Sequence, residues 1–123
     1  MCDLETQKKL DNAQFDRVVI KSGNHEIRKD QQLKLYQSVF RVLENEGLFI
    51  NLGFVFENQD ERDEFAELTR LKDKLAGMIA AYENRFFCIR DEFYGYLSKA
   101  GFTDVRAVLR FHYEINTETA IFD

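Results

Sequence analysis

The sequence predicts an α+β domain in which a small antiparallel or mixed sheet packs against two helices, the second very long. Apolar and polar residues alternate in the segments expected to be strands. In the segments expected to be helices, apolar residues recur at three- and four-residue spacing. The predicted order is an N-terminal hairpin, a helix, a central strand, the long helix and a C-terminal strand. We expect both helices on one face of the sheet.

The N-terminal part predicts a β-hairpin preceded by a weakly ordered segment. Residues 1–13 are mostly polar, so we expect little fixed structure there. The stretch from Phe15 to Lys21 is rich in strand-forming residues, and Ser22-Gly23-Asn24 supplies the glycine and asparagine typical of a tight turn. We therefore expect the first strand to pair with a short polar strand from His25 to Arg28.

A helix and a central strand are predicted next. Asp30 is suited to cap the helix, and Gly47 is suited to end it. From Leu48 to Glu57 every second residue is apolar, which predicts a strand with one strongly apolar face. The apolar positions of this strand are Leu48, Ile50, Leu52, Phe54 and Phe56.

The cluster Asn58-Gln59-Asp60-Glu61 is suited to cap a further helix. Helical spacing then continues from Asp60 to Ala100, where Gly101 provides a C-terminal cap. A helix of this extent would be about 60 Å long, whereas a compact domain of this chain length has a diameter of roughly 35 Å. Either the helix bends, with Gly77 as the weak point, or one end projects toward a partner. We expect one side of it to form the core against Ile50, Leu52 and Phe54, through Leu75, Ile79, Phe86, Ile89 and Phe93.

The last predicted element is a half-buried strand from Val105 to Asn116. Its apolar positions are Val105, Ala107, Leu109, Phe111, Tyr113 and Ile115, and these alternate with mostly polar residues. Thr103 and Asp104 are also suited to cap a helix, which is the competing interpretation of this segment. The sustained alternation favours the strand.

Composition and motifs exclude several classes of function. The 123 residues carry 17 basic and 22 acidic side chains, a net charge of -5, which is typical of one globular domain spanning residues 1–123 and does not favour direct nucleic-acid binding. No apolar run approaches the roughly 20 residues of a membrane span, so we expect no membrane contact and a cytoplasmic location. Phosphate-loop, dinucleotide, nucleophile-elbow and metal-ligand motifs are absent, so we expect no catalytic residues, cofactor or metal.

The favoured functional hypothesis is therefore protein binding. Ala80, Phe87 and Tyr94 are spaced by seven residues on the long predicted helix, about 100 degrees around from its core stripe. Aromatic residues outside the core stripe are typical of partner surfaces. We expect these three residues to bind another protein, and the chain to be a homodimer that acts as a small acidic adaptor or inhibitor without enzymatic activity.

Two alternatives remain open at the level of sequence. Arg106, Arg110 and His112 share the polar side of the C-terminal strand and could line an anion pocket of a small enzyme or ligand-binding domain. Alternatively, a cluster of carboxylates could mimic nucleic acid on the surface of another protein. These carboxylates are Asp60, Glu61, Asp63, Glu64 and Glu67, and capping of the long helix also accounts for them.

Overall fold

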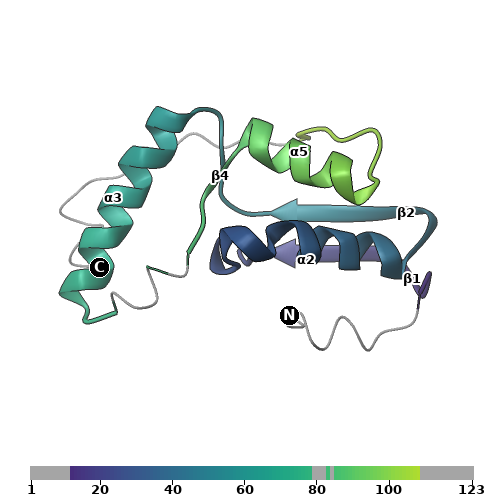
Figure 1. Ribbon diagram of the computed structural model, residues 1–123, viewed down its shortest axis with the longest axis horizontal. Coiled ribbons are helices and arrows are strands. Elements are labelled where there is room, and N and C mark those ends of the chain that lie inside the picture. Colours follow the sequence, from purple (N-terminus) through teal and green to yellow (C-terminus); the bar gives the residue numbers. More distant parts are fainter. Residues whose placement is uncertain (1–11, 79–82, 84, 109–123) are drawn as a thin grey trace.

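Two short parallel sheets organise the residues that the structure, a computed structural model, describes: 12–78, 83 and 85–108 (Figure 1). The fold is α+β, as predicted. The elements in chain order are β1 (Phe15–Lys21), a 3-10 turn (Asn24–Glu26), α2 (Lys29–Val42), β2 (Leu43–Leu52), β3 (Val55–Phe56), α3 (Gln59–Leu75), β4 (Cys88–Ile89) and α5 (Arg90–Ala100). Among these residues, no helix is long and apolar enough to cross a bilayer.

The predicted N-terminal hairpin is wrong. The strand β1 pairs with β2 in parallel, with Arg17 beside Leu48 and Lys21 beside Leu52, and parallel strands require a crossover connection, which α2 supplies here. The left-handed turn position falls on Ser22, whose φ is 54°. Asn24, which we expected in the tight turn of the hairpin, lies fully buried in the 3-10 turn that replaces the second hairpin strand.

The predicted central strand is split into two. β2 ends at Leu52, and the next two-residue strand, β3, pairs in parallel with β4. Gly53 lies at the break, where a β-carbon would come within 2.5 Å of the side-chain oxygen of Asn24. The Asn24 amide also donates a hydrogen bond to the carbonyl of Phe54 at 3.4 Å. Both sheets are parallel, so the predicted antiparallel or mixed arrangement is corrected.

The prediction of a very long second helix is also wrong for the described residues. α3 ends at Leu75, and the chain leaves the helix through Gly77, whose φ of 74° suits the left-handed region that glycine tolerates. Before α5 begins, the backbone N–H of Phe86 donates to the carbonyl of His25 at 2.9 Å, and β4 then pairs with β3. Apolar residues at helical spacing thus lie on two helices and a strand, while residues 79–82 and 84 fall outside the described part.

The main core lies between the β1–β2 sheet and the two helices α2 and α5, which cover the same face of the sheet (Figure 1). The prediction that Phe93 is buried is confirmed, but Leu75 is 63% exposed and Leu52 is 49% exposed. Phe86 and Ile89 are partly buried, and Ile79 lies outside the described residues. The buried residues of the core are Ile20, Leu35, Tyr36, Val39, Leu43, Cys88, Phe93, Leu97 and Ala100.

The predicted C-terminal strand is not formed at residues 105–108, and residues 109–116 lie outside the described part. The glycine cap before it is confirmed. Gly101 has a φ of 112°, its N–H donates to the carbonyl of Ser98, and the N–H of Phe102 donates to the carbonyl of Leu97. The ring of Phe102 then packs edge-to-face on Phe40 at 5.3 Å.

Gly101→Ala is expected to lower the free energy of unfolding by about 1–3 kcal/mol, because alanine resists positive φ. A β-carbon at this position would also lie 2.9 Å from the nearest ring atom of Phe40. Gly95→Ala is a matched control within the same helix, where a β-carbon meets nothing within 4 Å; it is expected to stabilise by about 0.5–1 kcal/mol. Urea denaturation measures both, and destabilisation of similar size by the two variants would contradict the cap.

Candidate functional site

The residues predicted to bind a partner do not share one helix: Phe87 precedes β4, whereas Tyr94 lies on α5. Phe87 is 5% exposed, and its ring packs on Phe65 at 5.4 Å and stacks on His25 at 5.7 Å. Tyr94 is partly buried against the main core, and Ala80 lies outside the described residues. Their contact with a second chain stays a prediction, but most of the Phe87 ring already packs within the chain.

Phe87 belongs to an aromatic cluster, which also contains Phe54, Phe56 and Phe65. These rings lie 4.8 to 6.3 Å apart between centroids. Phe65 comes from α3, and Phe56 and Phe87 come from β3 and the residue before β4, so the cluster attaches α3 to the second sheet. From the sequence, these rings were expected on a single long helix and a single long strand, so the cluster was not predicted.

A polar network lies beside the aromatic cluster. Arg85 forms ion pairs with Asp73 of α3 at 3.0 Å and with Glu26 at 3.7 Å, and Glu26 also contacts the Nε2 of His25 at 3.0 Å. Burial lowers the pKa of His25, and the nearby Arg85 lowers it further, against the opposing effect of Glu26. The network therefore connects the C-terminal half of α3 to the segments before α2 and β4.

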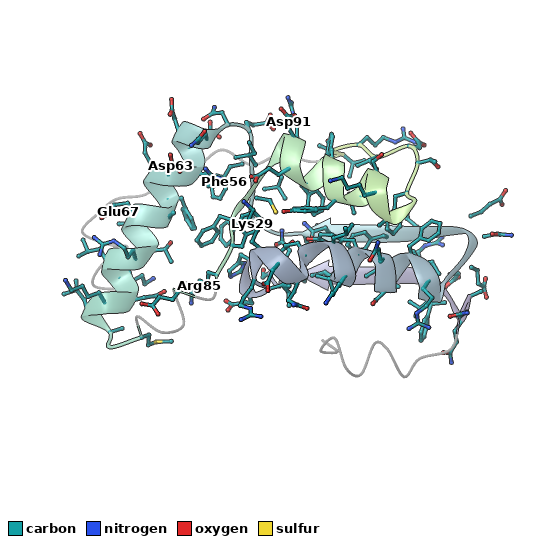
Figure 2. All side chains as sticks on the ribbon, viewed as in Figure 1. Lys29, Phe56, Asp63, Glu67, Arg85 and Asp91 are labelled. Atoms are coloured by element: carbon teal, nitrogen blue, oxygen red, sulfur yellow. The ribbon has the colours of Figure 1, made fainter. Side chains whose placement is uncertain are left out.

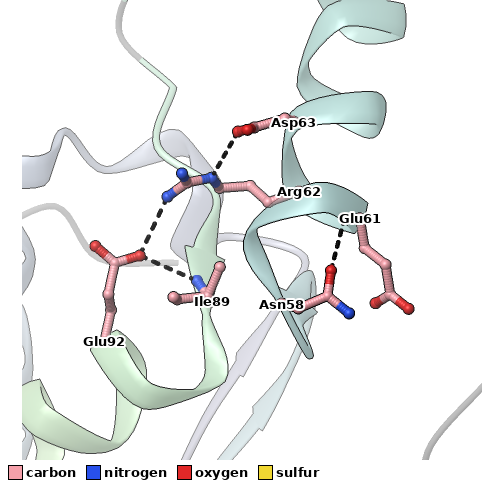
Figure 3. Close-up of polar contacts among 6 residues, drawn as sticks. All are labelled: Asn58, Glu61, Arg62, Asp63, Ile89 and Glu92. Carbon is pink, nitrogen blue, oxygen red and sulfur yellow. Dashed lines mark hydrogen bonds and ion pairs between the residues drawn. The ribbon is translucent and has the colours of Figure 1, made fainter.

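The predicted acidic cluster is divided between capping and ion pairs. The side chain of Asn58 accepts a hydrogen bond from the N–H of Glu61 at 2.9 Å, which confirms the predicted cap region (Figure 3). Arg62 contacts Asp63 at 3.2 Å and reaches Glu92 of α5 at 3.3 Å. Asp60 and Glu61 lie in the first turn of α3, where carboxylates favour the helix dipole.

The remaining acidic residues, Glu64 and Glu67, are exposed on α3. Glu67 accepts hydrogen bonds from Arg70 at 2.7 and 3.2 Å, and this contact lowers the pKa of its carboxyl group. Figure 2 shows Glu67 and Asp63 on the side of α3 away from Phe56. They lie beside Leu68 and Leu71, with which they line a shallow depression.

The predicted anion pocket is not assembled by the described residues. Arg106 is exposed and pairs with Asp104 at 2.9 Å, and Arg110 and His112 lie outside the described part. Other basic side chains converge instead on an open cleft of about 580 Å³, which is lined by Arg28, Lys29, Asp30, Glu83, Arg85 and Tyr96. Two of these arginines contact carboxylates: Arg28 pairs with Asp30 at 3.4 Å, and Arg85 pairs with Asp73.

The outer face of the β1–β2 sheet is the most distinctive surface. The outer face is the side of this sheet opposite α2 and α5. It contains Arg17, Val19, Lys21, Leu48, Ile50 and Leu52. Val18 and Phe49 pack toward the core, so their strand neighbours point outward. Val19 is 54% exposed, and Leu48 and Leu52 are each 49% exposed. Parallel sheets are ordinarily covered on both faces, whereas no described helix covers this one.

The fold and these surfaces define an α+β protein with two small parallel sheets and, in the described residues, no cluster of three or more metal-ligating side chains. Comparisons with protein-family models, curated proteins and solved structures found no match.

Proposed function

We propose that this chain is a non-enzymatic protein-binding module, a small acidic adaptor or inhibitor, and that it binds through the outer face of the β1–β2 sheet. The observation that carries the proposal is the exposure of Val19, Leu48 and Leu52 on neighbouring strands. The helix-centred version of the hypothesis required one continuous helix, and α3 ends at Leu75. The binding surface is therefore assigned to the sheet.

The chemistry of this face supports binding to a protein. Isolated exposed apolar side chains are ordinary, but here Val19 lies beside Ile50 in the register and is flanked on β1 by Arg17 and Lys21. Apolar residues bordered by polar ones are the pattern of a protein interface, in which the apolar centre is dehydrated and the rim stays solvated.

Leu48→Asp is expected to abolish binding of a partner, because it puts a carboxylate in the place of one of the exposed aliphatic side chains of this face. Affinity capture from native lysate, quantified by mass spectrometry, compares this variant with the wild type. Val108→Asp is the matched control, since Val108 is 86% exposed and lies outside the sheet. We expect a stoichiometric partner on the wild type and on Val108→Asp, reduced about a hundredfold on Leu48→Asp.

Two results would contradict the proposal. One is equal retention of the same partner by Leu48→Asp and the wild type. The other is the absence of any stoichiometric macromolecule, including a second copy of the chain, on the wild type. Because Leu48 is half-exposed, Leu48→Asp is expected to retain the wild-type circular dichroism spectrum.

A further inference from the structure

A second surface with exposed leucines lies on α3. Its outer flank, by which we mean Glu64, Glu67, Leu68, Leu71 and Leu75, follows three- and four-residue spacing on one side of the helix. Leu71 is 37% exposed and Leu75 is 63% exposed. Phe65 points about half a turn away from Glu67, into the aromatic cluster. The outer flank is therefore separate from the contacts that hold α3 to its own chain.

The outer flank of α3 complements the outer face of the sheet in charge and in length. The flank combines leucines with Glu64 and Glu67, whereas the sheet face combines aliphatic residues with Arg17 and Lys21. α3 has 17 residues and spans about 25 Å. β1 has 7 residues and spans about 23 Å. One such helix is long enough to cover the whole face.

The α3 helix cannot cover the sheet of its own chain in this arrangement. The aromatic cluster holds its first half, the Arg62 contact with Glu92 ties it to α5, and the Asp73 contact with Arg85 holds its second half. Figure 1 shows α3 beyond the end of the β1–β2 sheet, beside β4. An α3 helix that covers the outer face must therefore come from another molecule.

We infer that the outer face of the β1–β2 sheet is covered by the outer flank of α3 from a second copy of this chain. Reciprocal exchange gives a closed two-fold dimer with two identical contacts. The β1–β2 sheet of each copy then has helices on both faces, as parallel sheets ordinarily do. The inference rests on the proposed function, because it names the partner of the same surface.

Charge reversal across the contact tests the pairing. Lys21→Glu and Glu64→Lys are each expected to weaken self-association about tenfold, since each places like charges together, and the double variant is expected to recover most of the wild-type affinity. Sedimentation equilibrium over a series of concentrations measures the dissociation constants. Lys99→Glu, at an exposed site on α5, is the matched charge control and is expected to leave association unchanged.

A second variant tests the apolar part of the contact between the two copies. Leu75→Lys is expected to weaken self-association about a hundredfold while leaving unfolding of the monomer nearly unchanged, because Leu75 is 63% exposed. A wild-type chain that stays monomeric at about millimolar concentration would overturn the inference. So would dimerisation that is insensitive to Leu75→Lys and shows no rescue in the double charge variant.

These outcomes separate the inference from the proposed function. If Leu48→Asp abolishes capture of a different protein while the wild type is monomeric, the sheet face is a binding surface and its partner is not a second copy. If Leu48→Asp disrupts a dimer that Leu75→Lys leaves intact, the dimer uses the sheet face without α3. In both cases the inference fails and the proposed function stands.

Discussion

Phe87→Ala is expected to lower the free energy of unfolding by about 3–5 kcal/mol, the cost of removing a buried aromatic side chain from a packed core. Phe87 is 5% exposed and lies among rings contributed by α3, by β3 and by the residue before β3. Its loss removes contacts on several sides at once, because these segments meet at this ring.

Chemical denaturation followed by circular dichroism measures the effect. Phe15→Ala is the matched control, since the same atoms are removed from a site that is 37% exposed; a loss of no more than about 1.5 kcal/mol is expected there. If Phe87→Ala costs no more than Phe15→Ala, the ring is not a core residue. The prediction that Phe87 contacts a second chain would then be supported again.

Gln32→Leu is expected to cost at least about 3 kcal/mol, although leucine is nearly as large as glutamine. The buried Gln32 amide donates to the carbonyls of Asn24 and Ile27 at 2.8 and 2.7 Å, and its oxygen accepts from the hydroxyl of Tyr36 at 2.8 Å. Leucine would leave these three groups without their partner, at about 1–3 kcal/mol for each buried group. The side chain of Gln32 therefore holds the 3-10 turn to α2.

Gln37→Leu makes the same substitution at an exposed site on the same helix and is expected to change stability by no more than about 0.5 kcal/mol. Urea denaturation of the two variants provides the comparison. Equal stability of Gln32→Leu and the wild type would show that the buried hydrogen bonds contribute no net stabilisation.

Local signals in the sequence predicted the start of α3 and the end of α5 correctly, but not the ends of α2, which runs from Lys29 to Val42 rather than from Asp30 to Gly47. Asn58 caps α3 and Gly101 caps α5, because each cap depends on side-chain or backbone geometry within a few residues. The strand at Phe15–Lys21 was also located correctly. Its parallel pairing was not predicted, since it depends on contacts between residues far apart in the sequence, such as those of the buried Asn24 with Gly53 and Phe54.

The long helix shows why periodicity alone was insufficient. Leu75, Phe86 and Phe93 fit helical spacing, but the intervening segment contains residues that pair with β3 over a separation of some thirty positions, as in Val55 beside Cys88. Tertiary pairing of this kind leaves no local signal. Burial of Cys88 within the core raises the pKa of its thiol to about 12, an effect that depends on the same pairing.

The candidate surface was missed because the more apolar face of β2 was expected to face the core. The alternation of Leu48, Ile50 and Leu52 was assigned to the core, whereas Phe49 faces the core and the alternating set faces outward. Parallel sheets are typically covered on both faces, and a period-two pattern alone does not tell which of the two faces the helices of the same chain cover.

The most direct test of the central claim is whether the outer sheet face becomes inaccessible as molecules associate. A single thiol is introduced by Val19→Cys, a site that is 54% exposed, in a chain in which Cys2→Ser leaves only the buried Cys88. We expect the alkylation rate of this thiol to fall about tenfold or more as protein concentration rises through the dissociation constant, while a thiol introduced by Lys99→Cys keeps its rate. An alkylation rate at position 19 that is independent of concentration and equal to that at position 99 would contradict the account.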